Sequence, residues 1–146
     1  MKADSKSLKE EGVETGLAER GTTMNITLWV LQSLLAVAFL AHGWLFLSPP
    51  ANIVEQMNAV IPRPFQIFLG VAEVLAAVGL TLPGITRILP GLVPCAAAGL
   101  MIVMIGATVL HLARGEYSSA ATTAVLLVVL TFVAYLRWKV RPISPR

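Results

Sequence analysis

Residues 65–82 read FQIFLGVAEVLAAVGLTL, an apolar run that holds a single ionisable side chain, Glu73, at its midpoint. The run is just long enough to cross the hydrocarbon core of a bilayer as one helix. A carboxyl group at the centre of such a helix costs roughly 2.5–3.5 kcal/mol on insertion scales. This stretch therefore predicts a membrane-spanning helix with a polar site in its interior.

The composition of the whole chain also favours a membrane protein. Only 13% of the 146 residues are charged and the mean hydropathy is +0.77, whereas soluble domains have about 25% charged residues. The single cysteine, Cys95, excludes an intrachain disulfide, a Cys-x-x-Cys redox pair and a cysteine-based zinc site. No basic stripe with interleaved aromatic residues suggests a nucleic-acid partner. The lipid bilayer is the first expected partner.

The apolar runs predict an all-α fold, a four-helix transmembrane bundle. Its spans are expected at residues 26–47, 65–82, 92–112 and 120–136. Helix-breaking residues separate them, since Ser48-Pro49-Pro50 follows the first span and Pro83-Gly84 follows the second. In the first outer loop, apolar residues at helical spacing between positions 53 and 61 predict a short amphipathic segment at the membrane interface.

The predicted membrane domain covers residues 24–141. Residues 1–23 are polar, carry charges of both signs and lack apolar periodicity, so we expect a disordered N-terminal tail. They also lack the short apolar region of a signal peptide. Met24 begins a natural first helix, which suggests the hypothesis that translation starts there. Residues 142–146 form a short basic C-terminal tail.

The basic residues indicate the orientation of the chain, because four spans place both termini on one side. That side carries nine basic residues and the other side carries two, Arg63 and Arg114. The nine are Lys2, Lys6, Lys9, Arg20, Arg87, Arg137, Lys139, Arg141 and Arg146. The positive-inside rule therefore predicts that both termini are cytoplasmic, in the inner membrane.

Glu73 belongs to a stripe of the second span. Gln66, Gly70, Glu73 and Ala77 are four, three and four residues apart, so they share one face of a helix. Small residues on that face allow a neighbouring helix to approach and shield the carboxyl from lipid. Two interpretations stay open for Glu73. It is either a hydrogen-bonded packing device, or a proton carrier or anchor for a polar group.

Two histidines lie in the predicted spans. His42 is about 8 Å outward of the first span's midpoint, at a depth that allows a hydrogen bond with Glu73. Alternatively, the His42 side chain lies near the interface and extends toward water. His111 ends the third span, where it either caps free carbonyls or marks the mouth of a cavity leading to Glu73. Haem ligation by the two histidines is disfavoured because nothing else supports it, and no metal site is expected.

Five glycines are expected to serve helix packing: Gly43, Gly70, Gly79, Gly99 and Gly106. Gly99 and Gly106 are one heptad apart and predict a packing groove on the third span. Cys95 has no activating neighbour in the sequence and is expected to be inert.

Four short stretches resemble one family in the same order. They are AFLAHG at 38–43, FLGVAEVLAAVGL at 68–80, ILP at 88–90 and MIGATVLHLARGE at 104–116. Residues 24–141 thus resemble the DoxX-like family of small bacterial four-helix membrane proteins. By this resemblance, Gly70, Glu73, Gly79 and His111 match the family's polar and glycine positions. Many relatives carry a lysine where this chain has Phe46, which leaves His42 as the candidate partner of Glu73.

The resemblance also implies a role. The family takes its name from a subunit of a membrane quinone-reducing sulfur oxidoreductase, and some relatives are linked to redox stress complexes. It therefore implies an accessory or structural membrane subunit, associated with a redox or quinone system through a membrane or redox partner protein, or with a second copy. The residues themselves leave open a small proton-coupled transporter that uses Glu73. No flavin, haem or thiol motif is present, so we expect no catalysis by this chain alone, and quinone is the one cofactor left open.

Overall fold

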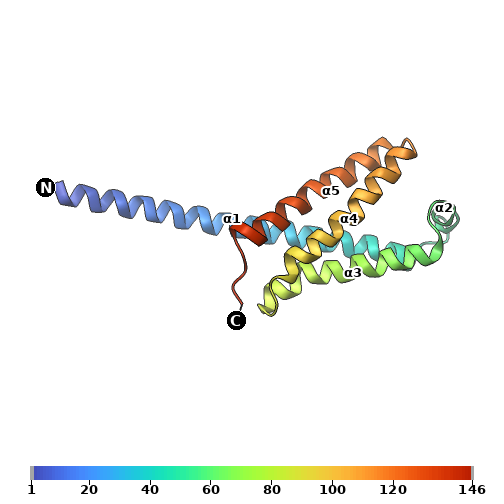
Figure 1. Ribbon diagram of the computed structural model, residues 1–146, viewed down its shortest axis with the longest axis horizontal. Helices are drawn as coiled ribbons and strands as arrows, with labels where there is room; N and C mark the ends of the chain where they lie inside the picture. The colour runs from blue at the N-terminus through green and yellow to red at the C-terminus, as the bar shows by residue number, and fades with distance from the viewer. Residues whose placement is uncertain (1, 146) are drawn as a thin grey trace. The chain divides into compact units, whose positions relative to one another are not determined.

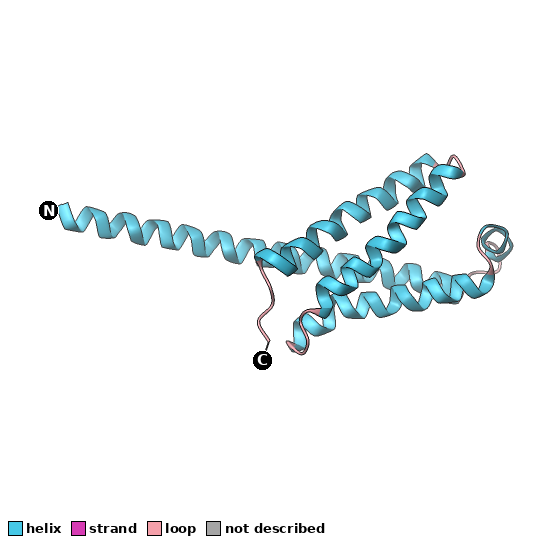
Figure 2. Ribbon diagram, in the orientation of Figure 1, coloured by secondary structure: helices cyan, strands magenta, loops and turns pink. Residues whose placement is uncertain are grey.

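The computed structural model describes residues 2–145, with side chains from residue 13 onward. The helices are α1 (Lys2–Leu47), α2 (Val54–Val60), α3 (Arg63–Thr86), α4 (Leu92–Ala113) and α5 (Tyr117–Tyr135), followed by a π-helical turn, η1 (Leu136–Val140) (Figures 1 and 2). No strand occurs among these residues. The described chain divides after Val30 into two compact units.

Four of the helices are long and apolar enough to cross a membrane, which confirms the predicted number of spans. These segments are Val13–Leu47, Arg63–Thr86, Leu92–Ala113 and Tyr117–Val140. Only 22–28% of the most apolar window of each is buried within the protein. Most of their apolar side chains therefore face outward, and a surface of that kind suits contact with lipid rather than water.

The second span is longer than the sequence predicts. Pro83 was expected to end it, but Pro83 lies inside α3, which continues to Thr86. Proline has no N–H, so the carbonyl of Gly79 loses its usual helical donor. One lost bond in the last turns of a helix is tolerated. The helix ends where Arg87 takes a left-handed conformation with φ of 59°, which a non-glycine residue rarely adopts.

The N-terminal segment also differs from expectation. Residues 1–23 were predicted to be a disordered tail, whereas α1 begins at Lys2; Met1 lies outside the described residues, as does Arg146 of the C-terminal tail. Helix extends at low cost from an existing helix because no new nucleus is needed. The hydroxyls of Thr22, Thr23 and Thr27 donate to carbonyls four residues earlier, which keeps polar side chains compatible with the helix.

The second half of α1 packs against α3 through two glycines. A Cβ atom added to Gly43 would lie 2.8 Å from the carbonyl oxygen of Gly70, and a Cβ atom on Gly70 would lie 2.8 Å from that of Gly43. Only glycine lets two helix backbones come this close. Gly70 lies on the predicted stripe of α3, and Gln66, Glu73 and Ala77 of that stripe are also buried.

Helix α3 contacts α4, and α4 pairs with α5 as an antiparallel hairpin (Figure 1). A Cβ atom on Gly79 of α3 would lie 2.9 Å from the Cβ of Ala96 on α4. The Thr108 and Thr123 hydroxyls, 2.8 Å apart, join α4 to α5. Buried side chains of the two helices are Val93, Pro94, Ala97, Leu100, Met104, Ala120, Leu130 and Val133.

Gly99 and Gly106 do not form the packing groove that was predicted on this helix. A Cβ atom added to either glycine would meet nothing within 4 Å, and both residues are exposed. The packed face of α4 instead follows Ala97, Leu100 and Met104. Gly99 lies two positions from Ala97, about 200° around the helix, so it faces away from the neighbouring helices.

These contacts predict opposite effects for the same substitution at two glycines. Gly70→Ala should lower the free energy of unfolding by about 1–3 kcal/mol, because the added methyl group meets backbone. Gly106→Ala should raise it by about 0.5–1 kcal/mol, because alanine favours helix and the site is open. Reversible unfolding of the full chain in mixed detergent micelles measures both. Equal stability of the two variants would contradict the close contact of α1 with α3.

Candidate functional site

Glu73 and His42 form a hydrogen-bonded pair between α3 and α1. Oε2 of Glu73 lies 2.7 Å from Nδ1 of His42. The Glu73 side chain is fully buried, whereas the His42 side chain keeps 49% of its surface exposed. The Gly43–Gly70 contact creates this arrangement, since it brings the two helices together one residue from His42 and three residues from Glu73.

The second carboxyl oxygen of Glu73 has an unusual environment. Oε1 is buried and has no hydrogen-bond partner among the described residues. Buried carboxyl oxygens normally find partners because leaving one unpaired costs about 1–3 kcal/mol. On the other side of the pair, the His42 and Phe46 rings make a T-shaped contact, with ring centroids 4.8 Å apart. The pair thus has an unsatisfied atom at its buried end and an exposed ring at the other.

The pair can hold either one proton or two while the imidazole ring stays neutral. With an ionised Glu73, the Nδ1–H of His42 donates to Oε2 and Nε2 carries a lone pair. With a protonated Glu73, the carboxyl O–H donates to Nδ1 and Nε2 carries the hydrogen. The second form holds one more proton than the first, so uptake of a proton by the pair turns the exposed Nε2 of His42 from an acceptor into a donor.

Gln66 lies on the same stripe but serves the loop before α3. Its Nε2 donates to the Ile61 carbonyl at 2.7 Å and to Oδ1 of Asn58 at 3.0 Å. Its Oε1 accepts a bond from Arg63 at 3.2 Å. These bonds use both ends of the amide, so Gln66 stabilises the chain between α2 and α3 and does not contact the Glu73 carboxyl.

Arg63 closes the end of α1 in the same region. Its guanidinium donates to the carbonyls of Phe46 and Leu47, each at 2.7 Å. These carbonyls have no helical donor because α1 ends there. Arg63 therefore joins the start of α3 to the end of α1.

His111 is placed differently from the prediction of a cavity mouth that leads to Glu73. Its Nδ1 lies 2.6 Å from Oε2 of Glu116, and Nε of Arg114 donates to Oε1 of the same carboxylate at 2.7 Å. The turn between α4 and α5, which carries Glu116, stands away from α3 (Figure 1). The His111 ring lies in the last turn of α4, as the capping interpretation expects, but its hydrogen-bond partner is the Glu116 carboxylate and not a free helix carbonyl.

A second buried polar cluster was missed by the sequence analysis. Gln32 is fully buried in α1, and its Nε2 donates to the Leu80 carbonyl of α3 at 2.6 Å. Its Oε1 accepts a bond from Nε of Arg137 at 2.6 Å, and Arg137 is only 3% exposed. Arg137 was expected only among the basic residues of the cytoplasmic side. Nothing in the sequence links two residues 105 positions apart.

The described residues contain no group of three or more His, Cys, Asp or Glu side chains that could hold a metal ion. The two histidines form separate pairs, one with Glu73 and the other with Glu116. Cys95, on α4, is exposed.

Four apolar membrane-length helices with a carboxyl–imidazole pair between two of them define an integral membrane protein with a buried polar site. A sequence model of the DoxX-like family matches residues 30–133. The chain therefore belongs to the DoxX-like family, which confirms the resemblance seen in the sequence. No curated protein and no solved structure gives a significant match.

The hydrogen bonds of Glu116 in the α4–α5 turn predict that the stability of the fold depends on pH. The bonds from His111 and Arg114 lower the pKa of Glu116 from its ordinary value of 4.5. A carboxyl with a lowered folded pKa stabilises the fold above its unfolded pKa, and this contribution is lost as the pH falls through the folded value. Unfolding of the full chain in detergent, followed below pH 4.5, should therefore show a steeper loss for wild type than for Glu116→Gln.

Glu55→Gln, at an exposed position of α2, serves as the matched control for this experiment and should keep the wild-type slope. A Glu116→Gln curve that is parallel to wild type throughout the acid range would show that the carboxylate makes no differential bond in the folded turn.

Proposed function

We propose that the protein is an accessory subunit of a redox system in the bacterial inner membrane, and that its His42–Glu73 pair contacts a quinone. One observation carries the proposal. An imidazole with 49% of its surface exposed is backed by a fully buried carboxyl, within helices of membrane-spanning length. An ionisable group at that depth is a functional hypothesis by default, and this one is accessible from outside the protein.

The donor set fits a quinone and its reduced form. A quinone carbonyl needs a hydrogen-bond donor, and a quinol hydroxyl needs an acceptor. Nε2 of His42 offers either one, according to whether the pair holds one proton or two. When Nε2 accepts a proton, the buried carboxylate stabilises the imidazolium at 2.7 Å. A bound quinone would supply the two-electron chemistry that these side chains lack.

The proposal assigns the electrons to a partner protein. Cys95 is the single cysteine and has no second thiol with which to form a disulfide. His42 and Glu73 can move a proton, but neither residue accepts an electron under ordinary conditions. The chain would therefore hold the quinone headgroup and take up its proton, while a membrane or redox partner exchanges the electrons.

Quinone binding by the purified full chain tests this proposal. Isothermal titration calorimetry of the detergent-purified chain with ubiquinone or menaquinone should show saturable binding. His42→Phe should weaken binding about tenfold, the value of a hydrogen bond worth about 1.4 kcal/mol. His111→Phe is the matched control, because it also removes an imidazole bonded to a carboxylate, and it should bind like wild type.

Equal binding by the two histidine variants would overturn the quinone contact. The unpaired Oε1 of Glu73 favours one second candidate, a proton-coupled transporter. Proteoliposomes with an entrapped pH-sensitive dye separate the two functions. Proton uptake that is abolished by Glu73→Gln and unaffected by quinone would support the transporter.

We also propose that both termini face the cytoplasm. Nine basic residues lie on the terminal side of the predicted spans and two lie on the other, as the positive-inside rule requires for this orientation. Green fluorescent protein fused after residue 146 should fluoresce, and alkaline phosphatase fused there should be inactive. Active phosphatase at that position would reverse the orientation.

A further inference from the structure

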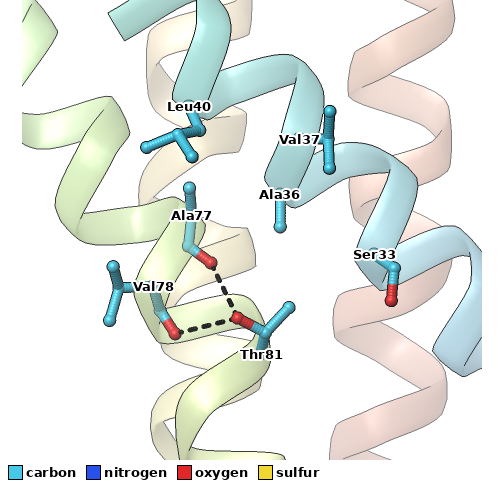
Figure 3. Close-up of a pocket in the computed structure, with 7 residues that line it drawn as sticks. All are labelled: Ser33, Ala36, Val37, Leu40, Ala77, Val78 and Thr81. Carbon is cyan, nitrogen blue, oxygen red and sulfur yellow. Dashed lines mark hydrogen bonds between the residues drawn. The ribbon is translucent and has the colours of Figure 1, made fainter. Parts of the chain in front are cut away.

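A groove of about 260 Å³ lies between α1 and α3 (Figure 3). Its lining residues are Ser33, Ala36, Val37 and Leu40 of α1, and Ala77, Val78 and Thr81 of α3. The α1 residues follow the spacing of one helical face, three, four and seven positions after Ser33. The small side chains of Ser33, Ala36 and Ala77 leave the gap, and Val37, Leu40 and Val78 form its rim.

The groove is almost wholly apolar. Thr81 contributes little polarity, because its hydroxyl donates within its own helix to the carbonyls of Ala77 and Val78, at 3.3 and 3.4 Å (Figure 3). The whole groove lies within the membrane-length segments Val13–Leu47 and Arg63–Thr86. Water that entered it would find too few polar partners to be stable.

One contact at each end of the groove keeps the two helices at a fixed separation. Beyond Leu40, the backbones of Gly43 and Gly70 are already in contact. Beyond Ser33, the buried amide of Gln32 donates to the carbonyl of Leu80 at 2.6 Å. The helices therefore cannot slide or close together to fill the gap without breaking one of these contacts. An empty groove would forfeit the dispersion contacts of its lining atoms.

We propose that this groove is a binding site for one hydrocarbon chain of a membrane lipid. Its rim belongs to the lipid-facing surface, since Val37, Leu40 and Val78 are 67%, 47% and 44% exposed. A chain can therefore enter sideways from the bilayer. The span from Ser33 to Leu40 is about 10 Å at 1.5 Å per residue, a third of the hydrocarbon core. The groove thus holds a segment of one acyl chain, more tightly than the lipids that surround the rest of the helices.

This site is separate from the His42–Glu73 pair. Leu40 and His42 are two positions apart on α1, about 200° around the helix. The groove and the imidazole therefore open on different sides of α1, and the lipid site does not depend on the quinone proposal.

Crosslinking to lipid tests the proposal on the unmodified full chain in nanodiscs. The nanodiscs contain a phospholipid with a diazirine on one acyl chain, and mass spectrometry maps the adducts after irradiation. Adducts should be several-fold enriched at residues 33–40 and 77–81 over more exposed lipid-facing positions, such as Ile102 and Val128 at 73% and 68% exposure. Adducts spread in proportion to exposure over all four helices would overturn the proposal.

Phenylalanine substitutions at two alanine positions give a second test. Ala36→Phe places a ring in the groove and should remove the adducts at residues 77–81. Ala41→Phe makes the same change at an exposed position outside the groove and should keep them. If Ala36→Phe does not fold, the wild-type adduct map decides alone.

A second copy of the chain is the competing occupant. Ser33→Cys in a Cys95→Ser background should stay monomeric when a mild oxidant is added to nanodiscs that each hold two copies. Efficient disulfide dimers through position 33 would assign the groove to another protein helix and overturn the lipid site.

Discussion

The backbone contact of Gly43 with Gly70 sets the geometry of α1 and α3, and the other features of this helix pair depend on it. Each added Cβ atom would lie 2.8 Å from a carbonyl oxygen of the other helix, so no larger residue preserves the spacing. This spacing buries Glu73 completely and brings Nδ1 of His42 to its carboxyl. In a membrane, where helix association gains little from the hydrophobic effect, close packing of small residues supplies much of the attraction. The contact between Gly43 and Gly70 therefore creates the site and also offsets the free-energy cost of burying the Glu73 carboxyl.

The polar side chains described above form separate small clusters, two within the membrane segments and one at the turn between α4 and α5. Glu73 pairs with a half-exposed imidazole, whereas Gln32 bonds a backbone carbonyl and Arg137 inside the fold. Glu116 gathers His111 and Arg114 at a turn outside the spans. The first cluster combines an accessible ring with an unsatisfied buried oxygen, and it is the one we connect with a ligand. The other two have the character of structural links, because their bonds join neighbouring segments of the chain.

The fold and part of the site could be predicted from the sequence because they depend on periodicity and depth. Runs of apolar residues give the four spans, and the spacing from Gln66 to Ala77 gives the buried face of α3. The depth of His42 and Glu73 along antiparallel spans allowed their hydrogen bond, although the alternative that His42 extends toward water stayed open until the structure placed the two side chains. Three features could not be obtained this way. The bond between Gln32 and Arg137 depends on how distant helices meet, and so does the open environment of Gly99 and Gly106. The helical state of residues 2–23 follows from extension of α1, a cooperative effect that local composition does not reveal.

Arg63 and Gln66 connect the end of α1, the segment through α2 and the start of α3 by side-chain hydrogen bonds. Its guanidinium holds the carbonyls of Phe46 and Leu47, and its neighbour Gln66 holds the Ile61 carbonyl and Asn58. Side-chain hydrogen bonds therefore join the end of α1 to the start of α3, in addition to the chain segment that runs through α2. None of the residues of α2 is buried. A cut in the backbone between α1 and α3 would leave two fragments that these bonds can still join. The protein is therefore suited to reassembly from two separately made pieces.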